Sequence, residues 1–144
     1  MKYTDNILMI AAAYSLYTLS VIFSTQYFAG INQLIPDIFS GRAHINISST
    51  FHLVIGSIVT AMLLVRFAPK PIMIAFLVAI AVNLESYILL LDKYSIDASI
   101  DYYLSHPSAI LNLLKPLILL PVITYLAGLI KRFEPPQSDG SNSN

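Results

Sequence analysis

Two ionisable side chains, Glu85 and Lys115, lie deep inside apolar stretches of this sequence. Glu85 belongs to residues 71–91, where Asn83 and Ser86 are the other polar residues, and Lys115 belongs to residues 108–130. An acid or a base at such a position is costly in hydrocarbon, so it needs an opposite charge, a proton or a wet cavity. Residues of this kind form structural ion pairs, proton relays or sites that bind the polar head of a ligand.

The elements that hold these residues are apolar stretches of bilayer length. The stretch 71–91 would rise roughly 31 Å as a helix, which matches the hydrocarbon core of a bilayer. Hydrophobic residues make up 56% of the chain and charged residues only 11%, against about 25% charged in soluble domains. We therefore predict an all-α polytopic membrane protein, an antiparallel four-helix bundle in a single domain (1–134), with spans at about 7–29, 50–67, 71–91 and 108–130.

The connections predict how the bundle is oriented. A short turn with two prolines (66–71) joins the second and third spans, and residues 135–144 form a polar tail that we expect to be disordered. Basic residues gather at one end of the spans (Lys2, Arg66, Lys70, Lys131 and Arg132). The positive-inside rule then places both termini in the cytoplasm and loops 30–50 and 92–107 outside. The membrane we expect is the cytoplasmic membrane of a bacterium or archaeon.

Counting along the spans predicts that Glu85 and Lys115 lie at the same depth. Glu85 comes six residues before Leu91, and Lys115 comes seven residues after Ser108. Both would lie roughly 9–11 Å inside the outer boundary. Since helices adjacent in sequence usually touch, we predict a Glu85–Lys115 ion pair with extra hydrogen bonds from Asn112 and Asn83. The pair would fix the helix register or would be a functional site.

The remaining chemistry-bearing residues support little else. His52 lies in the first turn of the second span, and a haem or metal would need a second ligand that the spacing does not provide. The chain has no cysteine and a net charge of zero, which argues against thiolate metal sites and against a nucleic-acid partner. No catalytic motif is present, so we lean against an enzyme and predict no metal and no evident cofactor.

Small side chains at four-residue spacing predict close helix contacts. In lipid, such residues let backbones approach, and packing replaces the hydrophobic drive. The predicted packing residues are Ser20, Ser24, Gly56, Ser57, Thr60, Ala61, Ala75 and Ala79.

The stretch His52–Leu90 resembles the middle of DoxX-like four-span membrane proteins, with its glycine-bearing second span, tight basic turn and alanine-rich third span. Some DoxX-like proteins are subunits of membrane oxidoreductase complexes, and the resemblance implies such a subunit as one expectation for this chain. It transfers no catalytic residue, and His52 stands where an acid is usual. A weaker resemblance, to phosphate-starvation-inducible PsiE-like proteins, rests on AVNLESYILLLDK at the end of the third span.

Three function hypotheses follow. The first is a non-catalytic membrane subunit or accessory protein, in contact with lipid and with other membrane subunits or further copies of itself, in a respiratory or redox complex. The second is a quinone- or proton-handling protein that uses Glu85, Lys115, Asn112 and His52. The third is a small transporter or channel that acts as an oligomer.

Overall fold

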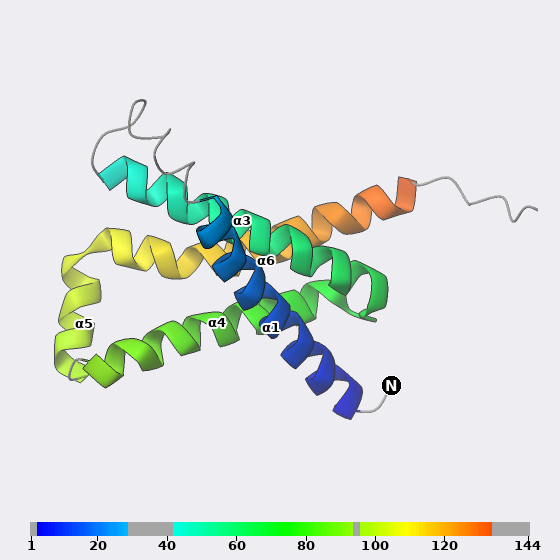
Figure 1. Cartoon of the computed structure of the whole chain (residues 1–144). Helices are drawn as coiled ribbons and strands as arrows, with labels where there is room; N and C mark the ends of the chain where they lie inside the picture. The colour runs from blue at the N-terminus through cyan, green and yellow to red at the C-terminus, as the bar shows by residue number, and fades with distance from the viewer. Residues whose placement is uncertain (1–2, 29–41, 94–95, 134–144) are drawn as a thin grey trace, which may run out of the picture.

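The protein is a bundle of long helices (Figure 1). The computed structural model describes residues 3–28, 42–93 and 96–133. Its helices are α1 (Tyr3–Tyr27), α3 (Arg42–Phe67), α4 (Pro71–Lys93), α5 (Ile96–Ser105) and α6 (Pro107–Phe133). The prediction of an all-α bundle with four long apolar helices is confirmed, and the tail 135–144 lies outside the described residues.

Four of these helices are long and apolar enough to cross a bilayer. The candidate spans are Asp5–Tyr27, Ser49–Phe67, Pro71–Leu89 and Ile110–Lys131. Lengths of 19 to 23 residues match a hydrocarbon core of about 30 Å. Large apolar side chains also cover the outer surface, for example Leu8, Met62 and Ile118. The chain is therefore an integral membrane protein.

Prolines define where two of the helices begin. Pro71 starts α4 and Pro107 starts α6, because the first helical position needs no amide donor and proline already has a helical φ. The carbonyl of Lys70 accepts the first helical bond of α4 from the Ile74 amide, at 3.1 Å. Helix α6 continues through Pro116 and Pro121, as membrane helices tolerate when neighbours stabilise them.

One predicted loop is partly wrong. The expected loop 30–50 ends early, because α3 already begins at Arg42. Hydropathy finds the span at Ser49, but it does not find the polar first turns that extend a helix beyond the bilayer. Neither proline nor glycine interrupts residues 42–55, so nothing in the backbone stops the helix there.

The order of the helices around the bundle places two flanks opposite each other. Helix α1 packs on α3 and α4, and α6 packs on the same two helices from the other side. Figure 1 shows α1 crossing in front of the others. The perimeter thus runs α1, α3, α6, α4. The groove between α1 and α4 lies on the flank opposite the groove between α3 and α6.

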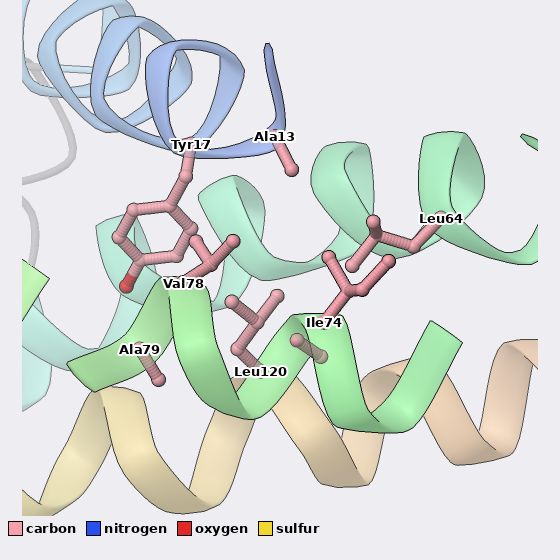
Figure 2. Packing of buried hydrophobic residues seen from close by; sticks show 8 residues of the cluster. Ala13, Tyr17, Leu64, Ile74, Val78, Ala79 and Leu120 are labelled. Atoms are coloured by element: carbon pink, nitrogen blue, oxygen red, sulfur yellow. The ribbon is translucent and has the colours of Figure 1, made fainter. Parts of the chain in front are cut away.

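The core is filled by side chains from all four spans. Figure 2 shows Tyr17 of α1 reaching toward Val78 and Ala79 of α4, with Leu64 of α3 and Leu120 of α6 beside them. All five residues are at most 2% exposed. The predicted packing residues lie around this core: all of them are buried except Ser20, which is half-buried.

Candidate functional site

Glu85 lies on the surface of the bundle, in a groove between α1 and α4. The groove has a volume of about 540 Å³, and Tyr14 is its other residue with a polar side chain. The Tyr14 hydroxyl lies beside the Glu85 carboxylate, close enough to interact with it. Ile7, Leu84 and Ile88 make the rest of the surroundings apolar. A carboxylate with one phenol partner therefore faces the lipid within a span.

Lys115 lies in a different groove, between α3 and α6. Its Nζ donates to the Ser49 Oγ at 3.2 Å, and Ser49 is the first residue of the second candidate span. The groove has a volume of about 730 Å³; apart from Lys115 and Thr50 its lining is apolar and includes Leu111, Leu114 and Ile118. The ammonium is half-buried at the edge of the bundle and turned away from the core.

The predicted Glu85–Lys115 ion pair is wrong. No salt bridge joins these two described residues, and each interacts with a different helix. The depth of a residue in the bilayer does not determine the side of the helix on which its side chain lies. Lys115 comes five residues before Leu120, which turns the two side chains roughly 140° apart. Since Leu120 faces the core, Lys115 points toward α3 at the bundle edge.

His52 is buried between α1 and α3. It is 5% exposed, and its Nδ1 lies 2.7 Å from the Ser24 Oγ. The neighbouring Phe51 packs edge-to-face on Phe28, with ring centroids 5.7 Å apart. His52 therefore acts here as a polar cross-link between two helices. It lies apart from both grooves, whose lining does not include it.

We expect Ser24→Ala to lower the stability of the protein by about 1–3 kcal/mol, because it leaves the His52 ring nitrogen buried without this partner. Thr25→Ala is the matched control, since the Thr25 hydroxyl is exposed and bonds only to the Ile22 carbonyl of its own helix. The measurement is the apparent melting temperature of the purified protein in detergent. Equal melting temperatures for the two variants would contradict the role of the Ser24–His52 bond.

The two asparagines do not join the charged residues. Asn112 is exposed on α6, and the Asn83 Nδ2 is buried without a hydrogen-bond partner. The buried hydroxyls of Ser57 and Thr60 have no partner either, and the Tyr17 and Ser57 hydroxyls lie close together without a well-formed hydrogen bond. Tyr17, Ser57 and Thr60 lie in the interior of the bundle, and Asn83 is half-buried. Glu85, Lys115, Asn112, Asn83 and His52 thus form no single site.

An aromatic cluster covers the end of the bundle where α5 joins α4 to α6. The Tyr102 and His106 rings stack with centroids 4.8 Å apart, and Tyr103 lies 6.5 Å from Tyr87 of α4. Burial raises the pKa of the Tyr103 phenol above its usual 10, and the adjacent Tyr102 and Tyr87 phenols add to the shift. Such rings are typical of the membrane–water interface.

This shift predicts how stability changes in alkali. The unfolded chain ionises Tyr103 at a lower pH than the folded protein does, so the Tyr103 contribution is complete below pH 10 and is lost as the pH rises through the folded pKa. The phenolate absorbance of the wild type minus that of Tyr103→Phe reports the ionisation of Tyr103. We expect this difference to develop with a midpoint above pH 10. A midpoint at 10 or below would contradict the packing of Tyr103.

Two partners of the charged residues were missed in the sequence. Tyr14 and Ser49 lie on helices remote in sequence from Glu85 and Lys115, and spacing along one helix carries no information about them. A depth count places Ser49 at the span boundary and Lys115 about 8 Å inside it, and the long lysine side chain spans this difference. No spacing rule would have selected Tyr14 from the four tyrosines of α1, at positions 3, 14, 17 and 27.

Comparisons with known proteins assign this chain to no family. No protein-family model, curated sequence or solved structure matches this chain. The resemblances to DoxX-like and PsiE-like proteins thus have no support from them. Within the part of the chain that the structure describes, no three His, Asp or Glu side chains lie close enough to hold a metal ion.

Proposed function

We propose that this protein is a non-catalytic membrane subunit or accessory protein that acts through side-by-side contacts with other membrane proteins. The observation that supports it is Glu85, an exposed carboxylate inside a span. An acidic residue costs about 2.5–3.5 kcal/mol at the centre of a membrane helix, and less near its end. A protein surface that covers Glu85 and donates to it would remove part of this cost.

The proposal includes an orientation and a membrane. Arg66, Lys70 and Lys131 lie at the end of the bundle that holds the amino terminus of α1 and the carboxyl terminus of α6. The positive-inside rule assigns this end to the cytoplasm, and α5 then lies on the outer face. We propose the cytoplasmic membrane of a bacterium or archaeon. Only the resemblance to DoxX-like proteins suggests a redox complex, and no comparison with known proteins supports that resemblance.

Affinity purification from native membranes tests this function. The wild type and Asp97→Asn, which removes an exposed acid of α5 outside the spans, should retain the same stoichiometric membrane partners. Glu85→Gln should lose most of them, because a neutral amide no longer attracts a cation. Retention of identical partners by all three proteins would contradict the proposal, and so would recovery of the wild type with lipid alone.

A second candidate function is the binding of a quinone or another amphiphile with a polar head in the α1/α4 groove. The Tyr14–Glu85 pair favours it, because a phenol and a carboxylate within an apolar groove offer one donor and one acceptor. Lipid extracts of the purified wild type would then contain about one quinone per protein, and Tyr14→Phe would contain far less. Quinone-free extracts of the wild type would contradict this candidate.

The channel hypothesis receives less support. Tyr17, Leu64, Ile74, Val78 and Leu120 fill the middle of the described bundle. A solute path would therefore run between copies and not through one copy.

A further inference from the structure

We propose that copies of this chain associate side by side in the bilayer, with the α1/α4 groove of one copy against the α3/α6 flank of the next. Glu85 of one copy then pairs with Lys115 of the partner subunit. This inference rests on the proposed function, in which lateral contacts are the activity, and it identifies a second copy as one partner. The pairing is between molecules, whereas within one molecule the two residues lie apart.

The first argument is the position of the two grooves. Their helix pairs occupy opposite sides of the perimeter α1, α3, α6, α4, so one copy presents Glu85 on one flank and Lys115 on the other. A translation within the membrane plane, with a small rotation about its normal, brings these flanks together. Such head-to-tail contacts build rings or rows.

The second argument is depth. Glu85 comes four residues before Leu89 at the end of its candidate span, and Lys115 comes five residues after Ile110 at the start of its span. Helix α5 joins these two ends, so both residues lie near the same membrane face. At 1.5 Å per residue, they are about 6 and 8 Å from the span boundary. Copies that share one orientation in the bilayer therefore hold the two charges at one level.

The third argument is the sorting of charge between the flanks. Glu85 is the one charged residue that lines the α1/α4 groove. The α3/α6 flank has a second groove, of about 760 Å³, lined by later residues of the same two helices, including Arg66 and Lys131. The described charged residues that line these two α3/α6 grooves are all basic: Lys115, Arg66 and Lys131. Contact between two α1/α4 grooves would bring like charges together in hydrocarbon. Contact between unlike flanks pairs opposite charges, so the head-to-tail arrangement is favoured.

The partners already present suit such a pair. A buried ion pair is favourable only if further hydrogen bonds satisfy the remaining lone pairs and protons. The Tyr14 hydroxyl lies beside Glu85, in position to donate one, and the Ser49 hydroxyl accepts one from Lys115. Both are retained when the long, flexible lysine side chain reaches across to the next copy. Apolar residues such as Leu84 and Leu114 surround the contact and exclude water.

Disulfide cross-linking in membranes tests the arrangement, because the chain has no cysteine of its own. Leu84→Cys and Leu114→Cys mark the two grooves, and these side chains are 55% and 42% exposed. Co-expressed copies with different tags, one variant each, should give a cross-linked dimer with both tags on mild oxidation. Neither variant expressed alone should cross-link to itself. Ile22→Cys, on the α1/α3 side and 48% exposed, is the matched control and should not cross-link to Leu114→Cys.

Charge exchange gives the second readout. Adding Glu85→Lys to the Leu84→Cys copy should reduce the two-tag dimer at least tenfold. Adding Lys115→Glu to the Leu114→Cys copy as well should restore it, which shows that both variants fold.

Self-dimers of Leu84→Cys would overturn the head-to-tail arrangement, and so would cross-links that form only to other proteins. An amount of two-tag dimer that stays the same when Glu85→Lys is added would also overturn it. The proposed function would survive that result if Glu85-dependent partners still co-purify with the native protein.

Discussion

Replacing Gly56 with leucine is expected to separate α1 from α3 and to abolish the folded bundle. A Cβ added to Gly56 would lie 2.6 Å from the Val21 Cγ2 and 3.3 Å from the Tyr17 carbonyl oxygen. The Val21 side chain is β-branched and has little rotamer freedom in a helix, and the carbonyl belongs to the backbone. Neither neighbour yields without a shift of α1.

Alanine at position 56 introduces the Cβ alone. Overpacking of this kind costs about 1–3 kcal/mol, so Gly56→Ala should lower the melting temperature in detergent and Gly56→Leu should leave no monodisperse protein. Gly128 on α6 is the matched control, because a Cβ there meets nothing within 4 Å. Gly128→Ala and Gly128→Leu should both fold. A stable Gly56→Leu protein would contradict the close approach of α1 and α3.

Tyr17→Ala is expected to cost about 2–4 kcal/mol, since its ring fills the centre of the bundle. Tyr17 is 2% exposed and packs with Val78 and Ala79 (Figure 2). In a bilayer, the unfolded chain is also surrounded by hydrocarbon, so transfer from water contributes little. The loss of stability comes instead from van der Waals contacts that are absent around the cavity.

Tyr17→Phe separates the ring from its hydroxyl. The Tyr17 hydroxyl has no well-formed hydrogen bond among the described residues, so its removal should change stability by less than about 1 kcal/mol and in the stabilising direction. The measurement is the same melting temperature for wild type, Tyr17→Phe and Tyr17→Ala. A destabilisation of Tyr17→Phe as large as that of Tyr17→Ala would show that the hydroxyl, and not the packing, carries the contribution.

The long helices could be predicted from the sequence because a bilayer dictates their length. Apolar stretches must reach about 30 Å and are bounded by polar or proline-containing segments. Pro71 accordingly marked the start of α4 to the residue. The start of α3 at Arg42 could not be found in this way, since the helix continues beyond the apolar stretch and hydropathy no longer follows the backbone.

The candidate site was only half predictable, for a geometric reason. Residue counts give depth, which is why Glu85 and Lys115 do lie near one level of the spans. The direction of each side chain depends on how each helix is rotated about its own axis. The packing of side chains in the core sets that rotation. Leu120 faces inward and turns Lys115 toward Ser49, while α1 supplies Tyr14 to Glu85.

The resulting molecule has a packed interior and two unlike flanks. Nothing in its core requires chemistry, whereas each flank has a charged group within a mostly apolar membrane-facing surface. Two complementary flanks on one small bundle favour assembly as the activity. In this view, Glu85 and Lys115 are contact residues. A charged side chain that faces lipid is unfavourable in the single copy, and pairing the two charges between copies favours the assembled form.

Counting the subunits of single labelled complexes in lipid vesicles tests this account most directly. The wild type should show more than one copy per complex at low protein density, Glu85→Gln should show mainly single copies, and the exchanged Glu85→Lys, Lys115→Glu chain should recover the wild-type distribution. Single copies of the wild type at every density, or an unchanged distribution for Glu85→Gln, would contradict it.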